Sequence, residues 1–154
     1  MTVRAARRAD VPAIVALLAD DAISAGRERA ATADALDEAY WRAFEAVDAD
    51  ARNLLVVAEL DREVVGTLQL TFIPSLTHRG GERAQIEGVR VRSDRRNAGV
   101  GRLLIGWAVE QARAHGCRLV QLTTDKRRTD AHRFYASLGF RASHEGMKLA
   151  LTPS

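Results

Sequence analysis

The sequence has few of the features, such as disulfides or membrane segments, that hold a protein by means other than the packing of its own core. Cys117 is the one cysteine among 154 residues, so the chain has no internal disulfide. It adjoins an apolar, strand-like run, which favours a packed structural thiol over a nucleophile. The opening residues MTVRAARRAD have no apolar run of the signal-peptide kind, and stretches such as NLLVVAEL are too short to span a bilayer. We therefore expect a cytoplasmic protein that makes no membrane contact.

Aromatic residues are also scarce, at 5% of the chain. A net charge of +3 and a pI near 9.6 would by themselves permit nucleic-acid binding. The charge is divided, however, because residues 10–50 hold ten acids and three arginines, whereas residues 90–133 hold eleven basic residues and four acids. Binders of single strands usually interleave exposed aromatics with basic residues, and this pattern is missing here. Nucleic acid is therefore an unlikely partner.

The length and a composition of 47% hydrophobic and 28% charged residues indicate one globular domain over residues 1–154. Periodicity and turn signals predict a mixed sheet with helices on both faces, in the order β-α-α-β-β-β-α-β-α-β-β. Expected strands cover residues 3–8, 53–60, 63–73, 84–91, 118–124, 140–143 and 147–151. Expected helices start at an Asp10 cap, cover residues 33–47 and 99–115, and cover 129–139 with Thr129 as N-cap. Asp61-Arg62 signals a hairpin, and Gly88 suggests a bulge.

Residues 92–104, RSDRRNAGVGRLL, join an expected strand to a long expected helix. The first turn of a helix exposes backbone N–H groups without intrahelical partners, and the helix dipole adds positive charge there. Gly99 and Gly101 leave room for phosphate oxygens, and Arg96 and Arg102 add charged donors. Neither a P-loop nor a dinucleotide fingerprint is present. The turn is therefore either a phosphate site or a glycine-eased turn with solvated arginines.

Two motifs decide between these readings. The run RNAGVG, residues 96–101, resembles the Arg/Gln-x-x-Gly-x-Gly/Ala signature of the GNAT superfamily of acyl-CoA-dependent N-acetyltransferases. The run AHRFYASLGF, residues 131–140, resembles the second signature of that family, a helix that carries a tyrosine and ends in Gly-Phe. The order of elements is similar along nearly the whole chain. The resemblance implies an α/β (mixed α+β) fold with a central, mostly antiparallel twisted sheet of about six to seven strands.

The resemblance also implies site residues and a donor, acetyl-CoA. Backbone groups of Val89, Arg90 and Val91 would pair with the pantetheine arm. The pyrophosphate would be held by Arg96 and by the amides of Asn97, Ala98, Gly99, Val100, Gly101 and Arg102. Tyr135 would lie near the thioester and protonate the leaving thiolate, although it could also be a core aromatic. Many members have asparagine seven residues before this tyrosine, and here Arg128 stands there.

Amide formation needs a base, because amines are mostly protonated at neutral pH. Glu87 is the first candidate, directly or through water, since it precedes the expected bulge and its mid-strand position suggests burial. A salt bridge to an arginine is the alternative role. His132, one helical turn before Tyr135, is the second candidate and is grouped with the cofactor-binding residues. No histidine pair has metal-ligand spacing with carboxylates, so no metal is expected.

The acceptor is expected to be a small-molecule or peptide amine. The first two helices would form one wall of its cleft by resemblance, and acids on that wall would favour a cationic amine such as a polyamine or an aminoglycoside-like compound. These acids are Asp20, Asp21, Glu28, Asp34, Asp37 and Glu38, and a solvated helix face is the alternative. The competing functions are a non-catalytic acyl-CoA sensor and, more remotely, a basic nucleic-acid-binding module. Late strands of this family often pair between subunits, which makes a homodimer plausible.

Overall fold

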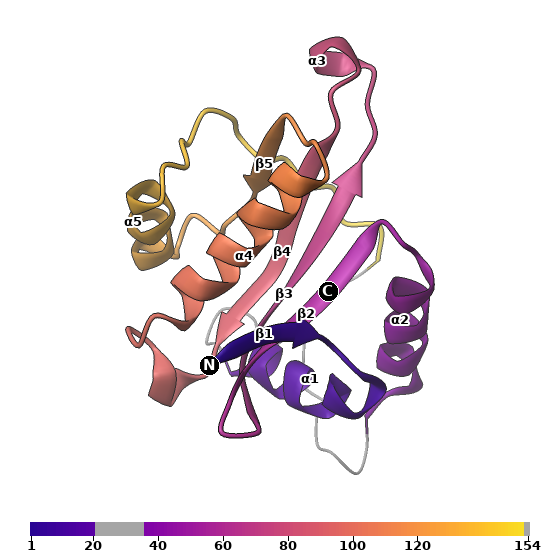
Figure 1. Cartoon of the computed structure of the whole chain (residues 1–154), viewed down its shortest axis with the longest axis vertical. Helices are drawn as coiled ribbons and strands as arrows, with labels where there is room; N and C mark the ends of the chain where they lie inside the picture. The colour runs from indigo at the N-terminus through magenta and orange to yellow at the C-terminus, as the bar shows by residue number, and fades with distance from the viewer. Residues whose placement is uncertain (21–35, 153–154) are drawn as a thin grey trace. The chain divides into compact units, whose positions relative to one another are not determined.

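The computed structural model describes residues 1–20 and 36–152, and the chain divides into two compact units, Met1–Gln121 and Leu122–Ser154 (Figure 1). The first unit holds nearly all of the sheet and four of the helices. Its strands are β1 (Thr2–Ala5), β2 (Asn53–Leu60), β3 (Glu63–Ile73), β4 (Arg83–Val91) and β5 (Leu119–Leu122), the last of which ends at the boundary. Its helices are α1 (Val11–Ala19), α2 (Glu38–Ala49), the short α3 (Thr77–Gly80) and α4 (Val100–Ala114).

The sheet follows the chain order β1-β2-β3-β4-β5. The first four strands are antiparallel neighbours. The crossover through α4 returns the chain to the same end of the sheet, so β5 runs in the direction of β4 (Figure 1). The expected mixed, mostly antiparallel sheet is confirmed. It has five strands instead of six to seven, because residues 140–143 and 147–151 form no strand.

Turn chemistry fixes the register of the two long hairpins. Asp61 and Arg62 both have positive φ, 51° and 66°, which is the conformation that a tight two-residue hairpin needs. Four residues, Thr77–Gly80, lie at the tip of the β3–β4 hairpin, and left-handed His78 and Arg79 make them a turn more than a helix. The predicted hairpin at residues 61–62 is confirmed.

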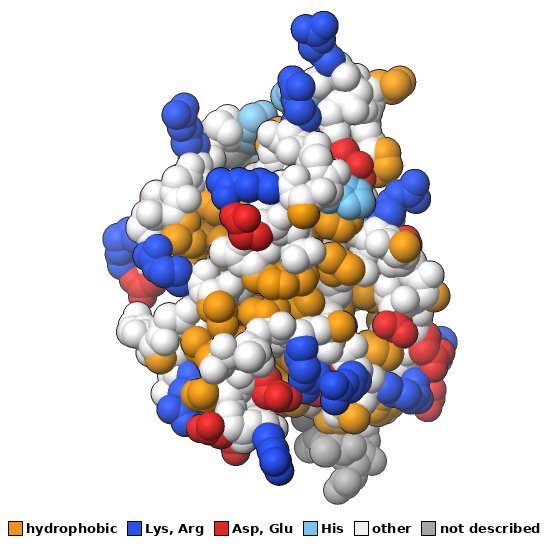
Figure 2. Space-filling model, in the orientation of Figure 1, with side chains coloured by type: hydrophobic (Ala, Val, Ile, Leu, Met, Phe, Trp, Pro, Cys, Tyr) orange, Lys and Arg blue, Asp and Glu red, His pale blue; other side chains and the backbone are white. Residues whose placement is uncertain are grey.

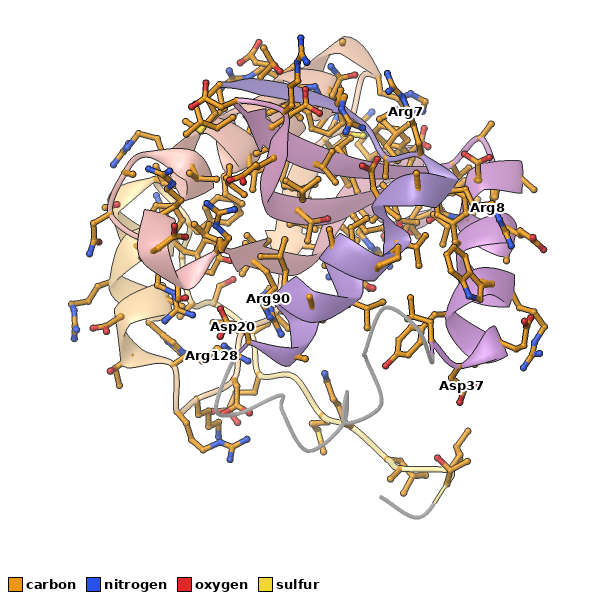
Figure 3. All side chains as sticks on the ribbon, turned by 90° about the horizontal axis from the view of Figure 1, so that it is seen from below. Arg7, Arg8, Asp20, Asp37, Arg90 and Arg128 are labelled. Atoms are coloured by element: carbon orange, nitrogen blue, oxygen red, sulfur yellow. The ribbon has the colours of Figure 1, made fainter. Side chains whose placement is uncertain are left out.

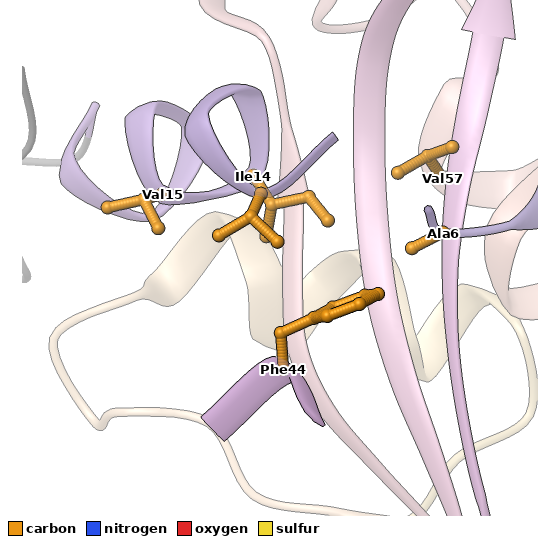
Figure 4. Packing of buried hydrophobic residues seen from close by; sticks show 6 residues of the cluster. Ala6, Ile14, Val15, Phe44 and Val57 are labelled. Atoms are coloured by element: carbon orange, nitrogen blue, oxygen red, sulfur yellow. The ribbon is translucent and has the colours of Figure 1, made fainter. Parts of the chain in front are cut away.

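Helices cover both faces of the sheet, as predicted. On one face, α1 and α2 pack a cluster of buried side chains against β2 (Figure 4). The cluster consists of Ala6, Val11, Ile14, Val15, Phe44 and Val57. On the other face, α4 buries Val100, Leu104, Ile105, Ala108 and Ala112. The sheet is therefore the middle layer of the first unit, with α1 and α2 on one face and α4 on the other.

One glycine determines how closely α4 approaches the sheet. A Cβ on Gly66 of β3 would lie 2.8 Å from Cγ1 of Val100 and 3.0 Å from Cδ1 of Leu104. Only hydrogen fits at that distance, so Gly66 lets the first turn of α4 rest directly on the strand. The position of the turn before α4 follows from this contact.

Two predicted caps are wrong. Asp10 precedes α1, but its carboxylate accepts from the guanidinium of Arg4 at 2.8 and 3.0 Å and from the Arg7 amide at 2.7 Å, not from the α1 amides. The carboxylate of Asp10 is therefore bound by Arg4 of β1 and not by the first amides of α1. Thr129 is the first residue of α5 (Thr129–Ser137), with Arg128 at the cap position and no side-chain cap bond. The start of the expected helix 33–47 lies outside the described residues.

The second unit contains α5 and extended chain. Gly139, with a φ of 93°, ends the helix by letting the amides of Leu138 and Phe140 both donate to the Tyr135 carbonyl. Tyr135 also makes an edge-to-face contact with Phe140, at 5.8 Å between ring centroids. Among the described residues of this unit, no side chain is fully buried.

Candidate active site

The second half of β4 carries the predicted bulge. Thr67 pairs with Arg90 and Gln69 pairs with Glu87, so two residues of β4, Gly88 and Val89, stand opposite one residue of β3. Gly88 adopts a φ of 62°, which a residue with a side chain rarely takes. The bulge is confirmed, and it changes the direction of the backbone where the sequence places the pantetheine contacts.

This half of β4 extends past its neighbour on the other side. The amide of Arg118 donates to the Glu82 carbonyl, and the side chains of Gln121 and Gln85 are bonded at 2.6 Å. These contacts align β5 with the first half of β4, and β5 ends at Leu122. Pairing of the residues after the bulge is shown with β3 alone. This second half of β4 is the segment that the sequence assigns to the pantetheine arm, which would add to it like an extended strand.

The turn between β4 and α4 has an unusual backbone. Asn97 and Gly99 both have positive φ, 63° and 85°, on either side of Ala98. Leu103 donates to the Gly99 carbonyl, so the amides of Val100, Gly101 and Arg102 precede the first helical donor. A 15-residue helix adds its dipole at this end. The result is a concave group of N–H donors of the kind that binds anions.

The arginines of this turn divide into two groups. Arg92 is held by Asp94 at 2.6 and 3.1 Å and by Glu63 at 3.0 Å, so it braces the turn. The same guanidinium holds the pKa of Asp94 below its ordinary value. Arg96 and Arg102 are exposed, and among the described residues Arg96 donates a long hydrogen bond, 3.3 Å, to the carbonyl of Asp20. Among the described residues of this turn, Arg96 and Arg102 therefore carry the exposed guanidinium groups, whereas Arg95 lies 3.7 Å from the Asp94 carboxylate.

Glu87 is exposed, so the expectation that it is buried is wrong. The bulge that follows it disturbs the ladder and leaves its side chain in solvent, opposite Gln69. No ion pair among the described residues includes Glu87, so the alternative role of a salt-bridge partner is not observed. Its carboxylate is accessible from solution, as a proton acceptor must be.

Tyr135 is half-buried on α5 and packs against Phe134 and Phe140. His132 is exposed on the same helix, 3.2 Å from the carbonyl of Asp125. Arg127 forms two bonds to the Asp125 carboxylate, at 2.9 and 2.8 Å, and keeps the pKa of that group well below its usual range. Within this unit, Arg127 therefore stabilises the turn before α5.

The acid-rich wall is described only in part. Asp20 ends α1 and Asp37 starts α2, where its carboxylate accepts from the Ala39 amide at 2.9 Å (Figure 3). Asp20, Asp37 and Glu38 are all exposed. The other three acids, Asp21, Glu28 and Asp34, lie outside the described residues.

One groove of the first unit lies elsewhere. Residues of β1, α2 and β2 line it together with Trp107 and Gln111 of α4, and its volume is about 350 Å³. Figure 2 shows hydrophobic side chains gathered in the middle of this face, between α4 and α2. None of the predicted donor-binding residues lines this groove. A second hollow, of about 430 Å³, is lined by Val3, Trp107 and Arg102, so it includes one of the predicted donor-binding residues.

Three further properties concern the cysteine thiol, metal ligands and membrane-spanning helices. Burial and the Glu82 carboxylate raise the pKa of Cys117, which disfavours a nucleophilic thiolate. Within residues 1–20 and 36–152, no three His, Cys, Asp or Glu side chains gather as metal ligands. No helix in the same residues is long and apolar enough to cross a membrane.

Sequence reasoning did not identify Gly66. Its role depends on which helix crosses β3, and this is set by contacts about forty residues apart along the chain. The one local signal is a glycine inside a strand of apolar residues, which often marks a close approach of another backbone or helix.

Comparison with known proteins agrees with this geometry. The model of the Acetyltransferase (GNAT) family matches residues 16–140. Aminoalkylphosphonate N-acetyltransferase of Salmonella typhimurium is 35% identical over 114 residues, which is 70% of this chain and 72% of that protein. Glucosamine 6-phosphate N-acetyltransferase of Trypanosoma brucei brucei is 36% identical over 88 residues, 57% of this chain and 58% of that protein.

A solved structure from Bacillus halodurans C-125, described as a transcriptional regulator, superposes with a TM-score of 0.94 at 49% identity, covering 97% of this chain and 99% of that one. The family match covers β4, the turn before α4 and the helix that carries Tyr135. On this evidence the chain is an acetyltransferase and belongs to the Acetyltransferase (GNAT) family.

Proposed function

We propose that the protein transfers an acetyl group from acetyl-CoA to the primary amine of a small molecule. The observation that carries the proposal is the β4–α4 junction, where a bulged strand edge leads directly into a concave row of amides. An extended pantetheine arm with a pyrophosphate at its end needs these two surfaces in this order. Val89 to Val91 would hold the arm, and the amides of residues 97–102 with Arg96 would hold the pyrophosphate.

The residues present fit this donor. Gly99 has open space where its Cβ would be, so phosphate oxygens can reach the amides. Arg96 would exchange its single long contact with Asp20 for a charged hydrogen bond. The Val89 carbonyl already accepts from the guanidinium of Arg90 at 2.8 Å, and that side chain would have to move when the arm binds.

The chemistry we propose is direct attack of the amine in a ternary complex. Glu87, directly or through a water, takes one proton from the ammonium group, and the free amine attacks the thioester carbonyl. The carbon–sulfur bond breaks, and Tyr135 gives its proton to the leaving thiolate. The nitrogen then loses its second proton, which returns to the Tyr135 oxygen directly or through water, so the products are the neutral amide and the thiol of coenzyme A. His132 is a weaker candidate for the base, because it already contacts the Asp125 carbonyl.

For the acceptor, we propose a small amine that also carries a phosphate or phosphonate group. Both named relatives act on such amines, an aminoalkylphosphonate and glucosamine 6-phosphate. The competing proposal of a cationic acceptor depends on the acidic wall. Three of the six carboxylates of that wall lie among the described residues. A screen should therefore place aminoalkylphosphonates and amino-sugar phosphates beside polyamines and aminoglycosides. Acetylation of the cationic set alone would favour the acidic wall.

Donor binding is tested by calorimetric titration with acetyl-CoA. The double variant Arg96→Ala, Gly99→Glu removes a cation and places a carboxylate in the amide row, so we expect affinity to fall by at least about 100-fold. Its matched control is Arg113→Ala, Gly106→Glu, which makes the same charge changes at exposed positions farther along α4 and should bind normally. Equal binding by all three proteins would contradict the proposal.

Catalysis is tested separately with Tyr135→Phe and Glu87→Gln. We expect both to bind acetyl-CoA normally and to lower kcat by about 100-fold or more, because each loses one proton-transfer group. A kcat unchanged by both substitutions would remove these residues from the mechanism. A sensor without productive chemistry predicts that neither variant differs from wild type.

A regulatory role is the second candidate, because the relative that is 49% identical is described as a transcriptional regulator. Binding to generic duplex DNA that weakens steeply with salt would support this role. Competition by coenzyme A would place the DNA at the same basic turn. We further propose that the protein acts in the cytoplasm and forms a homodimer.

A further inference from the structure

The face of the sheet that α1 and α2 cover is apolar only in part. A Cβ at Gly66 would contact Val100, so the even-numbered residues of β3 face α4 and the odd-numbered residues face α1 and α2. Thr67 and its partner Val57 are buried on the α1–α2 face. Farther from them, the same face carries five half-buried polar residues from four strands, which we call the polar row: Asn53, Gln69, Thr71, Gln85 and Gln121.

Hydrogen bonds across the strands hold the polar row in place. The hydroxyl of Thr71 donates to Oδ1 of Asn53 at 2.7 Å, and Nε2 of Gln121 donates to Oε1 of Gln85 at 2.6 Å. The amide nitrogens of Gln69 and Gln85 make longer contacts, 3.3 Å to Asn53 and 3.4 Å to the backbone carbonyl of the next residue. These two amides can therefore form better hydrogen bonds with a ligand's hydroxyl or acid oxygens.

A cation without a partner lies at one end of the polar row. Arg83 is two residues before Gln85 on β4, so it shares this face, and its side chain is half-buried. Its Nε is buried and has no hydrogen-bond partner among the residues that the structure describes. The neighbouring acid, Glu82, lies 3.3 Å from Nε2 of His115 at the end of α4, and no described carboxylate pairs with Arg83. A buried donor of this kind is costly unless an acceptor reaches it, which points to an anionic ligand.

The other end of the polar row is the candidate base. Glu87 pairs with Gln69, so it lies on the same face, beside the bulge. Four residues of strand, at about 3.3 Å each, separate the Cα atoms of Arg83 and Glu87 by about 13 Å. Both side chains are long, so the space between the guanidinium and the carboxylate suits a small molecule with an amine at one end and an acid group at the other.

On the basis of the proposed acetyl transfer, we propose that Arg83 binds the phosphate or phosphonate group of the acceptor, while the polar row binds its remaining oxygens and Glu87 its amine. The planar guanidinium matches two oxygens of such a group. Arg83 then determines specificity in two ways. It attracts an amine that carries an acid group, and it repels a polyamine, whose second ammonium group would lie beside it.

Binding of the acid group is tested without turnover by ³¹P NMR titration with ethylphosphonate, which lacks the amine. We expect Arg83→Gln to weaken binding by at least about 10-fold, and Arg83→Lys, which keeps the charge without the planar fork, to fall between Arg83→Gln and wild type. Arg79→Gln removes the same charge at the exposed tip of the same hairpin and should bind as wild type does. Glu87→Gln should bind no more weakly than wild type. Absence of binding by wild type, or equal affinities of Arg83→Gln and Arg79→Gln, would overturn the proposal.

Turnover separates this proposal from the proposed function. Arg83→Gln should raise the KM for 2-aminoethylphosphonate by at least about 10-fold and leave the KM for ethanolamine, which has no acid group, unchanged. Equal changes for both amines would overturn the role of Arg83. A wild type that binds ethylphosphonate through Arg83 but acetylates neither amine would contradict the proposed function and still support the anion site.

Discussion

The two units of the chain differ in what their side chains bury. Every fully buried side chain among the described residues lies in residues 1–121, on both faces of the sheet. Residues 122–152 include no fully buried side chain. Large apolar side chains at and after α5 are half-buried at Phe134, Tyr135, Leu138 and Phe140, and exposed at Met147, Leu149 and Leu151.

The difference shows how the two parts are stabilised. The first unit contains enough apolar surface to form a core without help. A segment of about thirty residues with no core is too small to be stable alone. The candidate acid Tyr135 therefore lies on the part of the chain that needs other surfaces for its order, whereas Glu87 and the amide row lie on the self-sufficient part.

The largest expected effect comes from truncating one leucine in each unit, a buried one in the first and a half-buried one in the second. Leu104 is fully buried, so Leu104→Ala should lower the free energy of unfolding by about 2–5 kcal/mol. Leu138 is half-buried on the tyrosine side, so Leu138→Ala should cost about 1 kcal/mol or less. Urea unfolding followed by far-UV circular dichroism measures both. Equal losses would mean that the second unit has a core of its own in solution.

A smaller effect is expected where α4 rests on β3. Gly66→Ala places a Cβ 2.8 Å from Val100 and 3.1 Å from the Arg90 carbonyl, so it should cost about 1–3 kcal/mol and weaken acetyl-CoA binding by shifting the turn. Gly106→Ala on the exposed side of α4 meets no atom within 4 Å and should gain up to about 1 kcal/mol. Thermal melts and calorimetric titration of both variants measure these changes. A Gly66→Ala protein as stable as wild type would show that α4 is free to move outward.

Local signals predicted much of the fold and of the backbone at the candidate site, whereas donor binding there stays a prediction. The hairpin at Asp61-Arg62, the bulge at Gly88 and the strand–turn–helix junction follow from backbone preferences within a few residues. The errors arise where distant groups compete. Asp10 was expected to cap α1, but Arg4 of the first strand takes its carboxylate. Glu87 was expected to be buried, but the bulge beside it turns the side chain into solvent.

The strand expected at residues 147–151 is a different kind of error, because the structure forms no strand there. Its alternation of apolar residues indicates a strand, and alternation measures only what the chain could pair with. A strand also needs a neighbour, and one described chain offers none to residues 147–151. The pattern of the sequence therefore predicts a tendency to form a strand, but it does not supply the neighbouring strand that pairing requires.

Two ion pairs, one in each unit, extend the comparison to the pH dependence of stability. Arg4 holds the carboxylate of Asp10, and this hydrogen bond keeps the pKa of Asp10 below its usual value. A lowered pKa stabilises the fold above the ordinary value near 4, and that stability is lost as pH falls through the folded value. Asp10→Asn should therefore cost about 1–2 kcal/mol at pH 7, after allowance for solvent around Arg4, and progressively less below pH 4. Urea unfolding of both proteins at pH 7 and pH 3 measures the change, and a constant difference would contradict it.

The smallest effect is expected from the matching pair in the second unit. Arg127 holds Asp125 as Arg4 holds Asp10, and it lowers the pKa of Asp125 in the same direction. The Asp125–Arg127 pair is largely in solvent, with 35% and 68% of the two side chains exposed, so water and salt screen most of the attraction. Asp125→Asn should leave the unfolding midpoint unchanged within error at both pH 7 and pH 3. A loss as large as that of Asp10→Asn would mean that this turn is covered in solution, as it would be if the second unit were buried against another surface.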